Sequence, residues 1–209
     1  GREKCGVMLI QGYSGNQGAY ECGIAPDIFP GGFAVKGDAA RRFSNLWHHP
    51  VSSQPGLDIP AITETAHEGR VKLLYSLGGN GLETSPHPEF MKAALSRVAL
   101  RVHQDIALNS SMLIEAGETV VLLPAQTRYE QRTGGISTSN ERRIRFTPEI
   151  PGHDIGETLP AWEIPIRIAR KSMSNGDKLF PFDHTQAIRE EMSRIMPIYQ
   201  GVESLNEEG

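Results

Sequence analysis

Three short apolar runs separated by helical segments constrain the fold of this chain more than any other feature. The runs cover residues 71–77, 99–103 and 119–123, and glycine, polar or proline residues follow each of them. Residues 88–97 have helical apolar spacing, and Asn109 is placed to cap a short helix. Near-continuous apolar strands alternating with helices are typical of a parallel sheet covered on both faces. The sequence therefore predicts an α/β fold: a parallel-sheet βαβαβ nucleotide-binding unit, part of a doubly wound domain.

The rest of the chain divides into segments of different composition. Residues 1–36 are rich in Gly and Pro and are expected to form a loop-rich segment. Residues 37–126 are expected to be the dinucleotide-binding portion, and residues 127–209 part of a neighbouring domain that begins with a polar, irregular stretch. Spacing and turn residues predict further elements: a strand at 6–12 and helices at 38–49, 58–68, 162–173 and 183–196.

Composition excludes several classes of function. The net charge of −4 is too balanced for a protein held to nucleic acid by phosphate attraction. No apolar stretch approaches the roughly 20 residues of a membrane helix. The two cysteines cannot form a disulfide scaffold, and neither they nor the seven histidines show a metal-ligand spacing. The chain begins at Gly1 without a leader pattern, and we expect it to be a piece of a longer polypeptide.

Polar and small residues follow the predicted strands at the point where each strand ends. Ligands of parallel sheets bind outside the carboxyl ends of the strands, where backbone N–H groups can hold phosphate oxygens. Taken singly, each of these positions could be a plain turn, a helix cap or a surface amide. A ligand site is indicated only because all of them lie at the same edge of the predicted sheet. The candidate cofactor-binding residues are Gly78, Gly79, Asn80, Gln104, Asp105, Asn109, Leu123 and Pro124.

Other nucleotide and catalytic signatures are missing from the sequence. There is no Walker A motif, no G-x-G-x-x-G fingerprint and no G-x-S-x-G elbow. Arg142 and Arg143 belong to a basic cluster, which is either a solvated, ion-paired face or a clamp on an anion.

Short runs in a fixed order along nearly the whole chain carry a family resemblance. They are QGAYECG at 17–23, AHEGRVK at 66–72, GGN at 78–80, VHQDI at 102–106, VLLP at 121–124, NERR at 140–143 and LPAW at 159–162. Each run is weak alone, but their ordered combination is fairly specific. The chain resembles the large catalytic subunit of molybdopterin oxidoreductases, in the formate dehydrogenase-like branch, and looks like an internal fragment of it.

The resemblance implies a bis(molybdopterin guanine dinucleotide) cofactor carrying molybdenum or tungsten. Gly78, Gly79 and Asn80 would line the guanine dinucleotide, with Gln104 and Asp105 beside it. An iron–sulfur cluster in a missing N-terminal part would relay electrons. The implied setting is cytoplasmic, with formate or a related substrate, the missing domains of the same polypeptide and an electron-transfer subunit as partners. The full-length protein would be the enzyme, and this fragment alone would be inactive.

One departure from the family concerns the substrate. The loop-rich segment 1–36 would lie near the active site, and Gln11 stands where formate dehydrogenases have an Arg. Tyr13 stands in place of a family Gln, and Ser139 in place of a frequent Asn. Gln11 is the candidate substrate-proximal residue, but a neutral amide cannot supply the bidentate charged pair that Arg forms with a carboxylate. The resemblance assigns no metal ligand to this chain.

Two alternatives use the same fold without redox chemistry. A stand-alone nucleotide-binding module would bind free guanine nucleotide tightly. A non-catalytic scaffold subunit would be encoded by a reading frame of about this length.

Overall fold

The computed structural model describes residues 2–3, 5–6, 12–139, 143–152 and 155–206. The chain forms two compact units, and each is assembled from separate stretches of sequence. Unit 1 comprises Gly1–Gly56, Arg132–Ile150 and Asp177–Gly209, and unit 2 comprises Leu57–Gln131 and Pro151–Gly176. The domain boundaries expected near residues 36 and 126 remain predictions.

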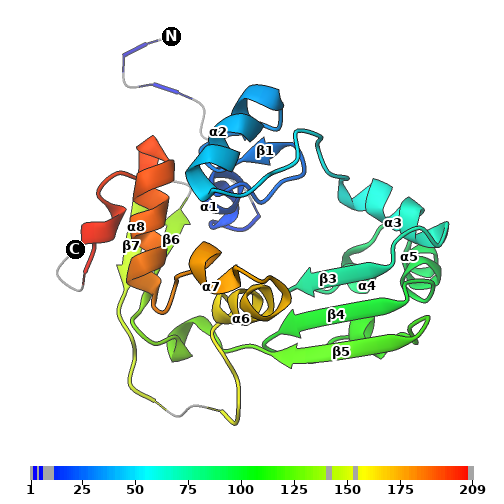
Figure 1. The fold of residues 1–209 in the computed structure, drawn as a ribbon. Coiled ribbons are helices and arrows are strands. Elements are labelled where there is room, and N and C mark those ends of the chain that lie inside the picture. The colour runs from blue at the N-terminus through cyan, green and yellow to red at the C-terminus, as the bar shows by residue number, and fades with distance from the viewer. Residues whose placement is uncertain (1, 4, 7–11, 140–142, 153–154, 207–209) are drawn as a thin grey trace. The chain divides into compact units, whose positions relative to one another are not determined.

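Unit 2 contains a parallel sheet of three strands, which confirms the predicted fold class (Figure 1). The strands are β3 (Leu73–Leu77), β4 (Leu100–Asp105) and β5 (Thr119–Pro124), in the order β3-β4-β5. Val and Leu dominate these strands, and such side chains pack well on a pleated surface. The central strand β4 is the most deeply buried, as its neighbours on both edges require.

Helices connect the strands and begin at residues suited to helix starts. Asp58 caps α3 (Ile59–His67) by accepting a hydrogen bond of 2.9 Å from the amide of Ala61. The crossover from β3 to β4 contains α4 (Gly81–Thr84) and α5 (Pro88–Leu95). The crossover from β4 to β5 contains only the 3-10 turn η1 (Ser110–Leu113), so the short helix predicted from Asn109 through Gly117 is present as one capped turn and ends four residues earlier. The remaining elements of unit 2 are η2 (Arg128–Glu130) and α6 (Glu163–Ser172).

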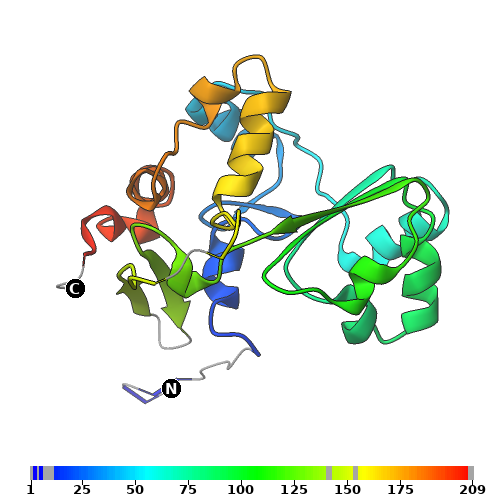
Figure 2. The same ribbon diagram turned by 90° about the horizontal axis from the view of Figure 1, so that it is seen from below.

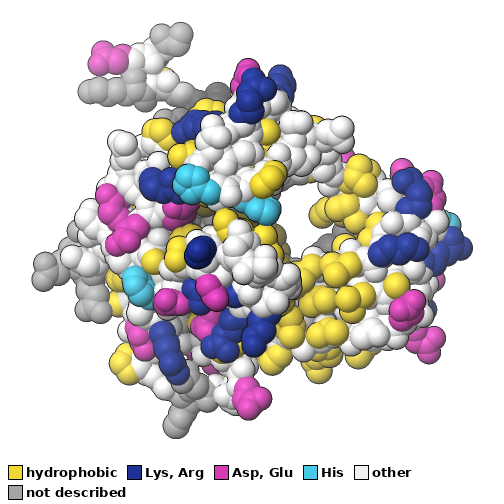
Figure 3. All heavy atoms as spheres, viewed as in Figure 1, with side chains coloured by type: hydrophobic (Ala, Val, Ile, Leu, Met, Phe, Trp, Pro, Cys, Tyr) yellow, Lys and Arg dark blue, Asp and Glu magenta, His cyan; other side chains and the backbone are white. Residues whose placement is uncertain are grey.

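Both crossovers pass on the same side of the sheet. Leu74 packs against the buried cluster that includes Ala94 of α5, and its register partner Arg101 donates hydrogen bonds to carbonyls of η1 and the residue that follows it. Side chains alternate along a strand, so Leu73 and Leu77 point to the other side, where they are 55% and 61% exposed. Hydrophobic atoms accordingly gather over β3, β4 and β5 in Figure 3. The same face is buried at the central strand, where Val102 and Gln104 are 8% and 1% exposed.

Unit 1 has its own aromatic core. Phe43 is fully buried and packs against Phe29 and Trp47, with ring centroids 4.9 Å away in both cases. The cluster includes Ile195, Met196, Tyr199 and Val202 from the C-terminal stretch. The elements from the first 56 residues are α1 (Asn16–Glu21), β1 (Ile28–Phe29), β2 (Phe33–Ala34) and α2 (Gly37–Trp47). The C-terminal elements are α7 (Gly176–Leu179), which begins at the end of unit 2, α8 (Thr185–Ile195), η3 (Pro197–Tyr199) and η4 (Val202–Ser204).

The polar stretch predicted to be irregular contains a β-hairpin. Strands β6 (Gly135–Ser139) and β7 (Arg143–Thr147) pair antiparallel, with Ile136 opposite Phe146 and Thr138 opposite Ile144. The prediction of an irregular segment is therefore wrong at these positions. The sequence does not reveal the two strands, because they are short and rich in Ser, Thr and Arg. The two C-terminal helices are confirmed as α6 and α8, and most of the strand predicted at 6–12 lies outside the described residues.

No helix among the described residues has the length and apolar character needed to span a bilayer.

Candidate functional site

The predicted cofactor residues of unit 2 meet at the carboxyl edge of the sheet. Leu77, Gln104 and Leu123 lie side by side in register, and the next row pairs Asp105 with Pro124. The arrowheads of β3, β4 and β5 point to this edge in Figure 1. We call the set Gly78, Gly79, Asn80, Gln104, Asp105, Asn109, Leu123 and Pro124 the carboxyl-edge site.

Two consecutive glycines shape the turn that follows β3. Gly78 and Gly79 have φ values of +69° and +79°, the left-handed region that L-residues rarely adopt. The amide of Gly78 donates to the carbonyl of Gln104 at 2.8 Å, which joins the turn to the end of β4. A Cβ atom at either glycine would meet nothing within 4 Å, so backbone conformation and not crowding requires glycine here.

Substituting alanine for Gly79 is expected to lower the free energy of unfolding by about 1–2 kcal/mol, because an L-residue is strained at this φ. The matched control is Gly81→Ala, which has equal open space, an ordinary φ and a place in the first turn of α4. The control is expected to be neutral or slightly stabilising. Urea unfolding of both variants checks this, and equal stability of the two would contradict the strain argument.

Asn80 connects the turn after β3 to the loop after β4. Its Nδ2 donates to Oγ of Ser110 at 2.9 Å, and its Oδ1 accepts from Oγ of Ser111 at 2.7 Å. The Ser111 hydroxyl also accepts a hydrogen bond of 2.9 Å from the amide of Leu82 at the start of α4. These three bonds hold two loops in one arrangement.

Asp105 and Asn109 form the next part of the network. The amide of Ile106 donates to Oδ1 of Asp105 at 2.7 Å, and Nδ2 of Asn109 donates to its Oδ2 at 3.2 Å. The same Nδ2 lies 3.4 Å from the carbonyl oxygen of Gly79, and Oδ1 of Asn109 accepts from the amide of Ser111. Each oxygen of the half-buried Asp105 carboxylate thus retains acceptor capacity for a further donor.

Gln104 differs from the other residues of the site, because its amide is fully used inside the protein. The side chain is 1% exposed, its Oε1 accepts from the hydroxyl of Tyr75, and its Nε2 donates to the carbonyl of Ala161 at 2.7 Å. Burial also raises the pKa of Tyr75, so the hydroxyl stays a donor. These bonds favour a positioning role for Gln104 that ties the segment before α6 to the sheet.

A cavity of about 250 Å³ adjoins the edge, and both His103 and Asp105 line it together with apolar side chains. His103 is 3% exposed, and its Nε2 has no hydrogen-bond partner among the described residues. Burial, reinforced by the charge of Arg101, lowers the pKa of His103, although Asp105 opposes the shift. Sequence reasoning missed both His103 and Arg101, and the available signal was two basic side chains inside an otherwise apolar strand.

The lowered pKa of His103 makes stability depend on pH. The imidazole of His103 is protonated near pH 6.5 in the unfolded chain but only at lower pH in the folded chain. The free energy of unfolding is therefore highest above pH 6.5 and decreases as the pH drops below that value. His103→Val removes the unpaired imidazole nitrogen and is expected to stabilise the chain by about 1 kcal/mol at neutral pH. Its stability should also fall less between pH 7 and pH 5. Urea unfolding against pH checks this, with the exposed His49→Gln as the control that should leave the acid loss unchanged.

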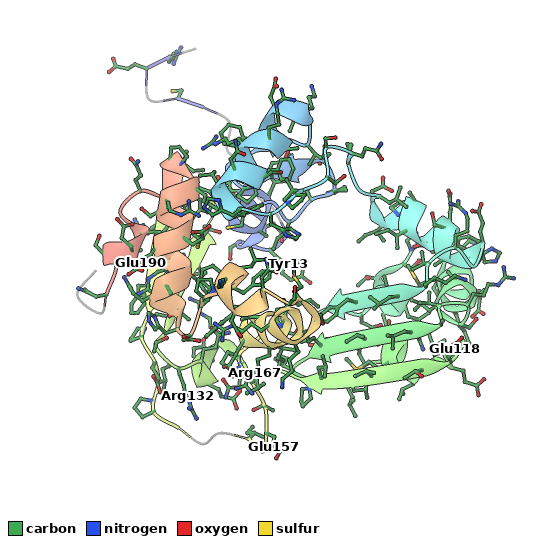
Figure 4. All side chains as sticks on the ribbon, in the orientation of Figure 1. Tyr13, Glu118, Arg132, Glu157, Arg167 and Glu190 are labelled. Carbon is green, nitrogen blue, oxygen red and sulfur yellow. The ribbon has the colours of Figure 1, made fainter. Side chains whose placement is uncertain are left out.

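The predicted substrate-proximal residue Gln11 lies outside the described residues, as does Arg142. Tyr13 is described and is 78% exposed (Figure 4). Arg143 is exposed at the start of β7, opposite Ser139 in the hairpin. Within the described ranges, no group of three or more His, Cys, Asp or Glu side chains is placed to hold a metal ion.

Comparison with known proteins gives a consistent set of relatives, although no family profile matches the chain. It is 30% identical over 202 residues to the F420-dependent formate dehydrogenase subunit alpha of Methanocaldococcus jannaschii. It is 32% identical over 206 residues to the F420-dependent formate dehydrogenase 2 subunit alpha of Methanococcus maripaludis. A third relative, one of the NADH-quinone oxidoreductase subunits of Rhizobium meliloti, is 28% identical over 188 residues.

The matches cover nearly all of this chain but a small part of each relative. Each of the two formate dehydrogenase matches covers 97% of the chain and 28% of the relative. The match to the NADH-quinone oxidoreductase protein covers 88% of the chain and 20% of that relative. This ordered similarity confirms the resemblance seen in the short sequence runs. The chain is a homologue of formate dehydrogenase alpha subunits and related oxidoreductases.

Proposed function

We propose that the carboxyl-edge site binds part of a bis(molybdopterin guanine dinucleotide) cofactor carrying molybdenum or tungsten. The whole protein then performs two-electron redox chemistry of the formate dehydrogenase kind. The observation that carries the proposal is the meeting of the Gly78-Gly79-Asn80 turn, Asp105 and Asn109 at one sheet edge, through strand register and hydrogen bonds.

The groups at this edge fit a guanine dinucleotide chemically. The amides of Gly79 and Asn80 make no hydrogen bond within the described part of the chain, and such amides can donate to phosphate oxygens. The Asp105 carboxylate has acceptor capacity for the N–H groups of a guanine or the hydroxyls of a ribose. The two glycines leave room for close approach of a ligand to the backbone.

The proposal assigns separate roles to the cofactor and to the residues around it. The cofactor, when bound, supplies the metal-centred electron transfer. Asp105 and the turn amides bind and orient it, while Gln104 and Asn109 hold the loops that present them. Gln11 lies near a small substrate such as formate. The iron–sulfur cluster, the electron-transfer partner and a cytoplasmic location belong to the same proposal, and the cofactor-covering parts come from the rest of the polypeptide.

Asp105→Asn tests the role of the carboxylate in the protein encoded by the full reading frame. The amide keeps the size of the side chain but replaces one acceptor oxygen with a donor, so it mismatches guanine N–H groups. The variant is expected to retain at least about tenfold less guanine nucleotide and metal after purification. The matched control is Glu118→Gln, an exposed acid just before β5 at the opposite end of the sheet (Figure 4). Equal retention in both variants would contradict the assigned role.

The stand-alone nucleotide module remains the second candidate, because the edge network is complete within unit 2. Titration of the 209-residue chain with GDP separates the two. Tight, saturable binding without any pterin favours the module, and its absence favours the cofactor proposal.

A further inference from the structure

A groove of about 860 Å³ lies on the helix side of unit 2 and shares no lining residue with the cavity that adjoins the carboxyl-edge site. One wall is a stripe along α5 and its C-cap residue Ser96, spaced as residues on a single helix face: Pro88, Glu89, Lys92, Ala93 and Ser96. The other wall is η1 and the two residues that follow it, and Leu82 and Glu83 of α4 also line the groove. Figure 2 shows α3, α4 and α5 gathered on one side of the sheet. We propose that this groove docks a basic amphipathic helix of a partner protein.

The floor of the groove is apolar and partly unused. Leu82 and Ala93 are half-buried, and Ile114 is 8% exposed. Leu113 is 77% exposed, although it belongs to the same wall as the buried Ile114. An exposed aliphatic side chain that lines a groove is typical of a position that an apolar anchor of a partner covers.

The rim is acidic. Glu83, Glu89 and Glu115 face one basic residue, Lys92, so the groove has a formal charge of −2. Glu89, Glu115 and Lys92 form no ion pair with any described residue. Uncompensated carboxylates around an apolar floor disfavour acidic partners and attract basic ones. The complementary partner therefore has apolar side chains on one face and Lys or Arg on both flanks.

The walls indicate a helix as the docked element. They are formed by side chains of α5 and η1, so an extended peptide would find no free strand edge to extend. The stripe on α5 spans about 12 Å, and ridges of a second helix can pack along such a stripe. No unpartnered buried polar atom among the described residues lines the groove, unlike the cavity beside His103, so nothing here converges on a small polar ligand.

This inference does not rest on the cofactor role. The groove includes Glu83 and Ser110, whose side chains are hydrogen-bonded at 2.8 Å, and Ser110 also bonds Asn80. The same loop arrangement therefore supports both the groove and the carboxyl-edge site. The residues substituted to test the groove lie outside the carboxyl-edge site.

The test uses a fluorescein-labelled helical peptide of about 18 residues, with Leu on one face and Lys on both flanks. Fluorescence anisotropy is measured on the 209-residue chain, on Glu89→Lys combined with Glu115→Lys, and on Leu113→Ser. The control is Glu64→Lys, an exposed acid on α3 that does not line the groove. Circular dichroism confirms that each variant is folded.

We expect saturable binding that weakens at least about tenfold in the double reversal and in Leu113→Ser, and less than about twofold in the control. The same peptide with Glu in place of Lys should bind only the charge-reversed protein. Equal weakening by Glu64→Lys, or no saturable binding, overturns the proposal. Sedimentation velocity tests a second copy of the chain as the occupant: self-association abolished by the double reversal would assign the groove to that copy and overturn the proposal.

Discussion

Replacing Arg101 with alanine is expected to lower the free energy of unfolding of unit 2 by about 3–5 kcal/mol. The side chain is fully buried in β4, and its guanidinium donates to the carbonyl of Ser111 at 3.1 Å and to that of Ile114. Removing it leaves two buried carbonyls unpaired and opens a cavity under η1. Burial lowers the pKa of Arg101 from its ordinary value, but the group stays charged, so relief of a buried charge offsets only part of this loss.

Two further variants separate hydrogen bonding from packing. Arg101→Met keeps most of the stem volume and loses the donors, so about half of the destabilisation is expected to remain. Arg70→Ala removes an exposed arginine paired with Glu68 and is expected to change stability by less than about 1 kcal/mol. Urea unfolding followed by circular dichroism measures all three. An Arg101→Ala protein as stable as Arg70→Ala would contradict the role given to this side chain.

Phe43→Ala is expected to destabilise unit 1 by about 3–5 kcal/mol. The ring is fully buried at the centre of the aromatic cluster, against Phe29, Phe33 and Trp47. Because no other core of unit 1 replaces these contacts among the described residues, the cavity cannot be filled without shifting α2. The near-volume-conserving Phe43→Leu is the control and is expected to lose about 1.5 kcal/mol or less. Tryptophan fluorescence during urea unfolding, measured in a Trp162→Phe background so that only Trp47 reports, checks this, and equal losses in the two variants would contradict the packing account.

The sheet and its carboxyl edge could be predicted because their signals are local. The runs predicted to end at Leu77, His103 and Leu123 are apolar and close to turn residues, and the observed strands end within two residues of them. Parallel pairing then places the turns at one edge, as the register confirms. Asn80 and Asn109 could be identified as candidates for the same reason, although their hydrogen bonds to each other's loops depend on tertiary contacts.

The features that sequence reasoning missed depend on long-range partners. Strands β6 and β7 are polar on alternate positions, and only their pairing and the contacts of Ile136 and Ile144 with the core define them. Arg101 and His103 interrupt a strand pattern, but nothing local shows that carbonyls of η1 and the following residue receive the guanidinium. Both crossovers pass on one side of the sheet, which periodicity cannot reveal.

The most direct measurement of the central claim is the guanine nucleotide and metal content of the protein encoded by the full reading frame. Acid hydrolysis releases GMP from a guanine dinucleotide cofactor, and elemental analysis quantifies molybdenum and tungsten. The proposal predicts two GMP per metal ion, since the bis cofactor carries two guanine dinucleotides, and loss of both in Asp105→Asn. A folded full-length protein that carries neither guanine nucleotide nor metal after expression in a host that makes the cofactor would contradict it.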